Sequence, residues 1–140
     1  MIRIARRLLD QIEAHARDAL PGEACGLLIG ARQAGATIVA AVEPTANVAA
    51  DPTRRFEIDP ARQIALQRAL RGTAQEIVGV YHSHPNGAAE PSATDAALAL
   101  DPDLLWLIVA LRNGRADAPR AFALVAGGGS FANVPMVIEE

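Results

Sequence analysis

A short stretch in the second half of the chain places two of its three histidines two positions apart, at the end of an apolar run. The run spans 77–81, and His82 and His84 follow it directly, before Pro85. Side chains at positions i and i+2 of a strand point to the same face of a sheet, so both imidazoles can reach one ion. Proline has no N–H for the ladder and ends the strand. The pattern therefore predicts a buried strand whose end carries a pair of metal ligands.

Ser92 and Asp95 follow after a polar, glycine-containing loop. Their spacing also fits the start of a helix, with Ser92 as the N-cap and Asp95 as the acid of a short capping box. The two interpretations are compatible, because an Asp in the first turn can point away from the helix end. A single histidine near a strand is more often a hydrogen-bonded core residue than a ligand. The coincidence of all these features within residues 82–95 favours a metal site.

The ligand types in this stretch indicate a zinc ion in a catalytic setting. Structural zinc sites are usually closed by four Cys or His ligands, whereas catalytic sites leave one position for water. The chain has a single cysteine, Cys25, which cannot build a Cys-rich structural site. Zinc lowers the pKa of a coordinated water to about 7. The predicted chemistry is therefore hydrolysis of a carbonyl compound, most simply of a peptide bond.

An upstream segment completes a resemblance to a known family. Residues 21–30 contain the sequence Glu23-Ala-Cys25-Gly, and residues 82–85 read His-Ser-His-Pro. Both motifs, in this order, resemble those of the JAMM (MPN-plus, Mov34-type) zinc metallopeptidases, and the likeness covers nearly the whole chain. The short form is similar to the small stand-alone bacterial branch. The resemblance implies an α/β fold: a single MPN-type domain over residues 1–140, with a cytidine-deaminase-like mixed β-sheet flanked by helices.

The resemblance also implies a role for each site residue. One Zn²⁺ per chain would bind His82, His84 and Asp95, while Glu23 would act as the general base and Ser92 would assist the oxyanion. From the residues alone, Glu23 could equally be an exposed acid in a turn. A base must come within about 3 Å of the proton that it abstracts. The strand that starts at Cys25 is therefore expected to lie beside the strand of the two histidines.

The substrate is implied by the resemblance and not by the residues. Members of the family cleave a peptide or isopeptide bond after the C-terminal Gly-Gly of ubiquitin-like proteins, and the bacterial branch acts on sulfur-carrier proteins of that fold. Family members use the region around residues 43–55 as a flap, so Asn47, Arg54 and Arg55 are candidate substrate contacts. A solvated connection is the alternative for this loop. The identity of the carrier and the oligomeric state, a homodimer included, stay open.

Other functions are weighed against this one. Some MPN domains lack the metal ligands and serve as scaffolds, and an isopeptidase for full ubiquitin-like conjugates would differ only in its substrate. A zinc deaminase would need His-x-Glu together with Pro-Cys-x-x-Cys, and the sequence has neither.

Composition and charge limit the partners and the cellular location that the sequence allows. A net charge of −3 gives no basic footprint for nucleic acid. No segment approaches the roughly 20 apolar residues of a membrane span. The basic start is followed by Asp10, Glu13 and Asp18, whereas transit peptides are poor in acids. With one cysteine and no internal disulfide, the protein is expected in the cytoplasm.

Periodicity predicts the remaining elements. An amphipathic helix over 3–20 would include Ile4 in its apolar stripe and leave His15 in solvent, and Cys25 would be a small buried hydrophobe. The later elements are strands at 25–29 and 36–42, a short strand at 56–58, a helix that Asp59 and Pro60 start and Gly72 ends, a helix from Ser92 to about Leu100, strands at 104–111 and 120–126, a glycine turn at 127–130, and an edge strand at 131–138 broken by Pro135.

Overall fold

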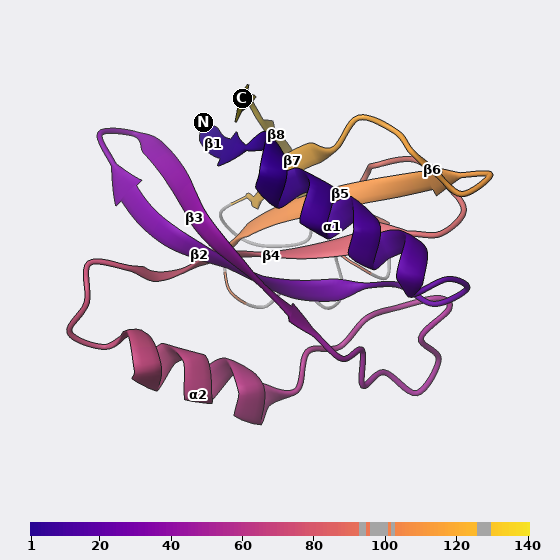
Figure 1. Cartoon of the computed structure of the whole chain (residues 1–140), viewed down its shortest axis with the longest axis horizontal. Coiled ribbons are helices and arrows are strands. Elements are labelled where there is room, and N and C mark those ends of the chain that lie inside the picture. Colours follow the sequence, from indigo (N-terminus) through magenta and orange to yellow (C-terminus); the bar gives the residue numbers. More distant parts are fainter. Residues whose placement is uncertain (93–94, 96–100, 102, 126–129) are drawn as a thin grey trace.

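The computed structural model describes the chain except for residues 93–94, 96–100, 102 and 126–129, and shows one mixed sheet with two helices (Figure 1). This confirms the predicted α/β fold. The strand order is β8-β7-β5-β4-β2-β3-β1-β9, with β6 paired to β5. In chain order, the elements are β1 (Ile2–Ala5), α1 (Arg6–Asp18), β2 (Cys25–Gln33), β3 (Ala36–Thr45), α2 (Pro60–Leu70), β4 (Glu76–His84), β5 (Leu105–Arg112), β6 (Arg115–Ala116), β7 (Arg120–Leu124), β8 (Phe131–Val134) and β9 (Met136–Glu139).

The two faces of the sheet carry separate apolar clusters. On one face, Leu8 and Ile12 of α1 pack with residues such as Leu107 of β5. On the other face, Trp106 and Ile108 of β5 pack with side chains from β2, β4 and the chain before α2. Successive residues of β5 thus serve opposite faces, as the two-residue period of a strand requires. Because both of its faces are covered, β5 has the continuous apolar sequence typical of a central strand.

Helix α2 starts as predicted, but it buries less apolar surface than its sequence indicates. The Asp59 side chain accepts a hydrogen bond from the Ala61 N–H at 2.9 Å, and Pro60 occupies the first turn. No residue of α2 is fully buried, and Ile64 is 47% exposed. Leu66 and Leu70 are partly buried against the cluster on the face opposite α1.

The prediction of a helix from residue 3 is wrong in its first turn. Residues Ile2–Ala5 form β1, which pairs in parallel with both β3 and β9. Ile2 and Ile4 are buried with a two-residue period, and α1 begins only at Arg6. Apolar residues at 2, 4 and 8 fit either period over so short a stretch, and pairing with a distant segment decides between them.

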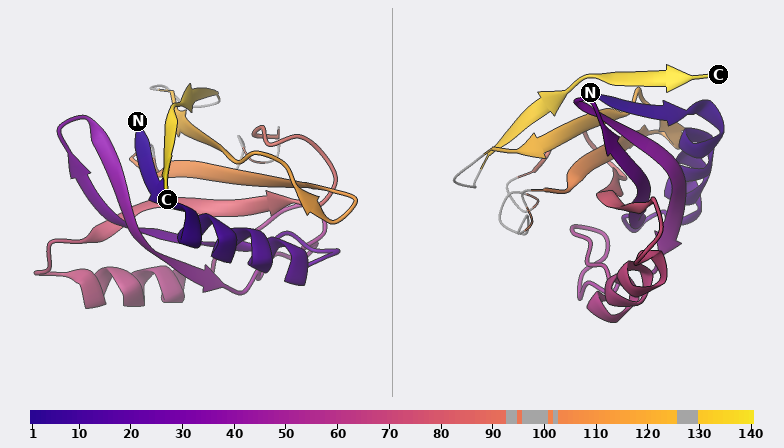
Figure 2. Two further views of the ribbon diagram at one scale, coloured as in Figure 1. Left: turned by 45° about the horizontal axis from the view of Figure 1, so that its top comes forward. Right: turned by 90° about the vertical axis from the view of Figure 1, so that its left-hand side faces the viewer.

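The C-terminal segment is not a single edge strand. β8 pairs with β7, and β9 pairs with β1, so the two halves on either side of Pro135 belong to opposite ends of the strand order. The Pro135 carbonyl accepts a hydrogen bond from the Ile2 N–H at 2.9 Å. This segment joins the two ends of the sheet, which is strongly curled (Figure 2).

Smaller differences concern single residues. Of the strand expected at 56–58, only a bridge between Ile58 and Asn47 forms, and the two-residue strand β6 was not predicted. His15 is half-buried and not fully solvated as expected: its Nδ1 lies 2.7 Å from the Tyr81 hydroxyl, and burial lowers the pKa of His15. Cys25 is fully buried, as predicted.

The helix expected from Ser92 and the turn at 127–130 fall mostly outside the described residues, although Asp95 is helical. In the part of the chain that is described, no helix combines the length and the apolar character needed to cross a membrane.

A glycine in β2 allows β2 and β3 to approach each other. A Cβ atom on Gly30 would lie 1.8 Å from the backbone oxygen of Ile38 on β3. We expect Gly30→Ala to lower the free energy of unfolding by about 2 kcal/mol or more, because a backbone atom cannot move aside as a side chain can. Urea denaturation measures the change, with Ala40→Ser at an exposed position of β3 as the control. Equal stabilities of the two variants would contradict the close approach.

Candidate active site

Two neighbouring strands position the candidate site. β2 and β4 are antiparallel, and Cys25 is the register partner of His82. At this end, the Ser83 N–H donates to the Ala24 carbonyl at 3.0 Å, and the Ala24 N–H donates to Ser83 Oγ at 2.8 Å. The chain next to Glu23 is thereby joined to the residue between the two histidines. This confirms the expected adjacency of the two strands.

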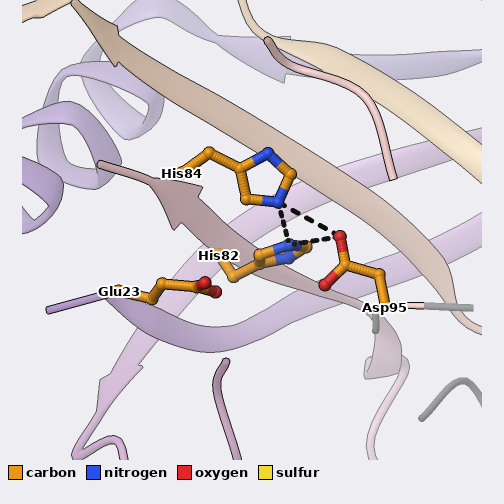
Figure 3. A group of neighbouring side chains, drawn as sticks. All are labelled: Glu23, His82, His84 and Asp95. Atoms are coloured by element: carbon orange, nitrogen blue, oxygen red, sulfur yellow. Dashed lines mark hydrogen bonds and ion pairs between the residues drawn. The ribbon is translucent and has the colours of Figure 1, made fainter. Parts of the chain in front are cut away.

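Three ligand atoms form a nearly equilateral triangle (Figure 3). The Nε2 atoms of His82 and His84 lie 3.1 Å apart, and Asp95 Oδ2 lies 3.2 Å from the first and 3.1 Å from the second. With the Glu23 carboxylate, four ligand atoms lie within 4.8 Å of one another. Ligands held at 2.0–2.1 Å around a tetrahedral zinc ion stand roughly 3.3 Å apart. The spacing of the triangle thus fits a metal ion.

The tautomer of His84 supports the same conclusion. Its Nδ1 lies 2.8 Å from the carbonyl oxygen of Ala88, which can only accept a hydrogen bond, so Nδ1 carries the proton. In neutral His84, the lone pair of Nε2 therefore faces His82 and Asp95. Lone pairs and a carboxylate at such distances repel one another unless a cation or a proton lies between them. Two imidazole nitrogens with one carboxylate oxygen are a typical donor set for zinc.

The same contacts explain the pKa directions. Burial would raise the pKa of Asp95, but hydrogen bonds to His82 and His84 outweigh it and lower the pKa. Burial lowers the pKa of the fully buried His82 despite the nearby Asp95. Burial also acts to lower the pKa of His84, but Asp95 and the Ala88 carbonyl raise it overall. The site therefore favours an ionised carboxylate and a neutral His82, which are the forms that bind metal.

Ser92 and Asp95 form the predicted capping box. The Ser92 N–H donates to Asp95 Oδ2 at 2.8 Å, and the Asp95 N–H donates to Ser92 Oγ at 3.0 Å. The Asp95 oxygen that faces the histidines is therefore also held by the start of the helix. The Ser92 hydroxyl proton takes no part in the box, and the residue is exposed.

Glu23 is a buried acid beside this triangle. It is 6% exposed, and its Oε1 atom has no hydrogen-bond partner among the described residues. The pKa of Glu23 is raised to about 7: burial is the largest cause, His84 opposes the shift, and Asp95 adds to it. A carboxylate with a pKa near neutrality can both accept and release a proton, as a general base requires.

The three loop residues predicted as substrate contacts lie in different places. Arg54 lines a hollow of about 450 Å³ together with Glu23, His84 and Ser92, and its side chain is 84% exposed. Arg55 lines a second hollow of about 510 Å³, beside Phe56. The Asn47 side chain is turned inward, where it hydrogen-bonds to backbone groups of the loop and of Glu23.

Sequence reasoning did not assign three residues that shape the site. Ser83 is buried between the two histidines, and Phe56 and Trp106 enclose the ring of His82. Trp106 was predicted only as part of a buried strand and Phe56 only as part of a short one. The single local signal was an aromatic residue at the end of a polar loop, beside Arg55.

Fold and site together define an α/β protein with a largely buried cluster of two histidines and two acids, whose spacing fits a metal ion. Residues 5–125 match the family described as prokaryotic homologs of the JAB domain, and the chain belongs to this family.

Several relatives are identical to this chain at about a third of the aligned positions. A desampylase from Haloferax volcanii is 37% identical over 71% of this chain and 73% of its own length. A CysO-cysteine peptidase from Mycobacterium tuberculosis is 33% identical over 86% of this chain and 80% of its own. A probable TtuB-protein conjugate cleaving protease from Thermus thermophilus is 32% identical over 89% of this chain and 76% of its own.

Solved structures agree on the fold. A protein from Desulfitobacterium hafniense, whose structure was determined in solution, is similar with a TM-score of 0.87 and 34% identity, over 100% of this chain and 94% of that one. A JAB1/MPN domain protein from Archaeoglobus fulgidus matches with a TM-score of 0.61 over 99% of both chains. At 20% identity, the second likeness concerns the fold alone.

The burial of Glu23 predicts a pH-dependent stability in protein stripped of metal by a chelator. The pKa is about 7 in the folded state against an ordinary value of 4.5, so stability falls as pH rises between these values. Each pKa unit corresponds to about 1.4 kcal/mol, so Glu23→Gln should be more stable than the wild type by about 2 to 3 kcal/mol at pH ~8 and equal to it near pH ~4.5. Urea unfolding at the two pH values tests this, and a gap independent of pH would contradict it.

Proposed function

We propose that the protein is a zinc-dependent metallopeptidase that cleaves the peptide or isopeptide bond after the C-terminal Gly-Gly of a ubiquitin-like or sulfur-carrier protein. The observation that carries this proposal is the gathering of four ligand atoms within 4.8 Å at the edge of an open hollow. The names of the relatives support it, because they are peptidases or proteases. The cytoplasmic location expected from the sequence belongs to the same proposal.

The metal would be held by His82, His84 and Asp95. When bound, zinc supplies a positive charge and a water of lowered pKa. Glu23 accepts the proton of the attacking water and later delivers it to the departing amine. Both steps suit its position, because the carboxylate is buried beside the triangle and its pKa lies near neutrality.

Ser92 would assist at the oxyanion. Its Oγ atom accepts the Asp95 N–H, so the hydroxyl is fixed in place and its proton can be donated to the oxygen of the carbonyl under attack. Arg54 lines the same hollow with an exposed guanidinium, in a place where a substrate would pass. We keep Arg54 and Arg55 as proposed substrate contacts.

A carrier protein of ubiquitin fold with a C-terminal extension after Gly-Gly tests the activity. Intact mass should show loss of the extension with the zinc-loaded wild type. Glu23→Gln should retain zinc but cleave at least about 100-fold more slowly, because the general base is lost while the three metal ligands remain. Full activity of this variant would reject Glu23 as the base. A wild type that binds zinc but cleaves no extended carrier and no conjugate would favour a scaffold.

Removal of Asp95 should act on the metal instead. We expect Asp95→Ala to lose most of its zinc on dialysis, as measured by elemental analysis, because one of three protein ligands is gone. Ser92→Ala is the matched control. It removes the hydrogen bond from the Asp95 N–H to Ser92 Oγ but leaves all three proposed metal ligands in place. Tight stoichiometric zinc in Asp95→Ala would reject Asp95 as a ligand.

A further inference from the structure

Among the described residues, His82 lacks the hydrogen bond that usually supports a metal-binding histidine. Such a residue normally donates its other ring N–H to a carboxylate, a carbonyl or water, which fixes the orientation of the ring. Here Nδ1 of His82 is buried and has no hydrogen-bond partner among the described residues. His84, by contrast, has the Ala88 carbonyl in this position. Within the part of the chain that the structure describes, the contacts that orient the His82 ring are therefore packing contacts.

Two aromatic rings enclose His82. The Phe56 ring is stacked on the imidazole, with centroids 4.4 Å apart and an interplanar angle of 20°. Trp106 meets the imidazole at 5.3 Å and 86°, and Phe56 and Trp106 contact each other at 5.5 Å. His82 has no exposed surface. Face and edge packing of this kind restricts the rotation of the ring as a hydrogen bond would, and excludes water from it.

The two rings differ in how they reach the site. Trp106 belongs to β5, which lies beside β4 and is fixed by the sheet. Phe56 comes from loop 46–58, which belongs to no strand and whose two ends are joined by an isolated β-bridge between Asn47 and Ile58. Its place on His82 therefore depends on what holds the loop.

Asn47 holds the loop. Its Nδ2 donates to the carbonyls of Arg55 at 2.9 Å and Glu23 at 3.1 Å, with Pro52 at 3.4 Å. Its Oδ1 accepts the N–H groups of Glu57 at 3.0 Å and Ala49 at 3.1 Å. These contacts use both protons and both lone pairs of the carboxamide, so it has no capacity left for a substrate. Two of them, to Arg55 and Glu57, fix the backbone on either side of Phe56.

The same loop also holds Glu23. The Glu23 N–H donates to the Pro52 carbonyl at 2.7 Å, and its carbonyl accepts from Asn47. We propose that Phe56 is a positioning residue for the metal ligand His82, and that Asn47 places Phe56 and Glu23 together through loop 46–58. The choice of zinc as the ion rests on the proposed function.

Release of zinc to an excess of a chromophoric chelator tests this in the zinc-loaded protein. Phe56→Leu should release zinc about 10-fold faster or more, in the range known for lost support of a ligating histidine. Phe56→Tyr keeps the ring and should restore a rate near that of the wild type. Phe131→Leu is the matched control, because Phe131 contacts Trp106 at 5.1 Å on the same face but is not among the rings that meet His82.

The absorption spectrum of the cobalt(II)-substituted protein gives a second readout. Phe56→Leu should change the ligand-field bands, which report the geometry of the ligands, while Phe131→Leu should leave them unchanged. Asn47→Asp removes the donors of Asn47 and should shift zinc release in the same direction as Phe56→Leu. If Asn47 contacted the substrate instead, its variant would raise KM and leave zinc release unchanged, which would overturn its assigned role.

The outcomes separate this inference from the proposed function. A wild type that releases zinc slowly, with equal rates and spectra in Phe56→Leu and Phe131→Leu, overturns the positioning role and leaves the proposed function in place. A wild type that takes up neither zinc nor cobalt overturns both. Faster release in Phe56→Leu, with Phe131→Leu and Phe56→Tyr like the wild type, supports the positioning role whether or not a carrier protein is cleaved.

Discussion

The close spacing of His82 Nε2, His84 Nε2 and Asp95 Oδ2, 3.1 to 3.2 Å apart in a buried site, is the constraint on which the rest of this structure depends, because these atoms repel one another unless a proton or a cation lies between them. Solvent screens this repulsion little, because His82 has no exposed surface and Asp95 is 2% exposed. The fold therefore holds the three groups in place by other means: the sheet positions the histidines, and a capping box positions the acid. Such an arrangement costs stability by itself and becomes favourable with a cation between the ligands.

Glu23 extends the same constraint to a fourth group. It faces the triangle, its Oε1 accepts no hydrogen bond from a described residue, and burial keeps its pKa near neutrality. Its backbone is nevertheless tightly held, on one side by the pairing of Ala24 with Ser83 and on the other by the loop that carries Asn47. A firmly held backbone with an unpaired carboxylate oxygen is typical of a group kept for proton transfer, since sites of this kind retain polar atoms that the core would otherwise satisfy.

The sequence was informative where the relevant spacing is local. The His-x-His pair, the capping box of Ser92 and Asp95, the start of α2 and the apolar strand β5 all lie within short stretches, and each was predicted. Errors occurred where a distant partner decides. The pattern around Ile4 fits two periods until β3 and β9 are present, and neither the contact of His15 with Tyr81 nor that of Phe56 with His82 has a local signal. The assigned role of each site residue stays a prediction.

The pairing of β1 with β9 affects how the molecule withstands force. These strands are parallel, with Ile2 beside Met136 and Ala5 beside Glu139, so the two ends of the chain leave the pair in opposite directions. Tension applied at both ends would slide the strands along each other and load the ladder bonds together, instead of opening them one at a time. The weakly packed α2 and loop 46–58 lie between β3 and β4 in the chain, so they do not carry the force between the two ends. Mechanical unfolding from the termini would therefore meet its main resistance at the β1–β9 pair.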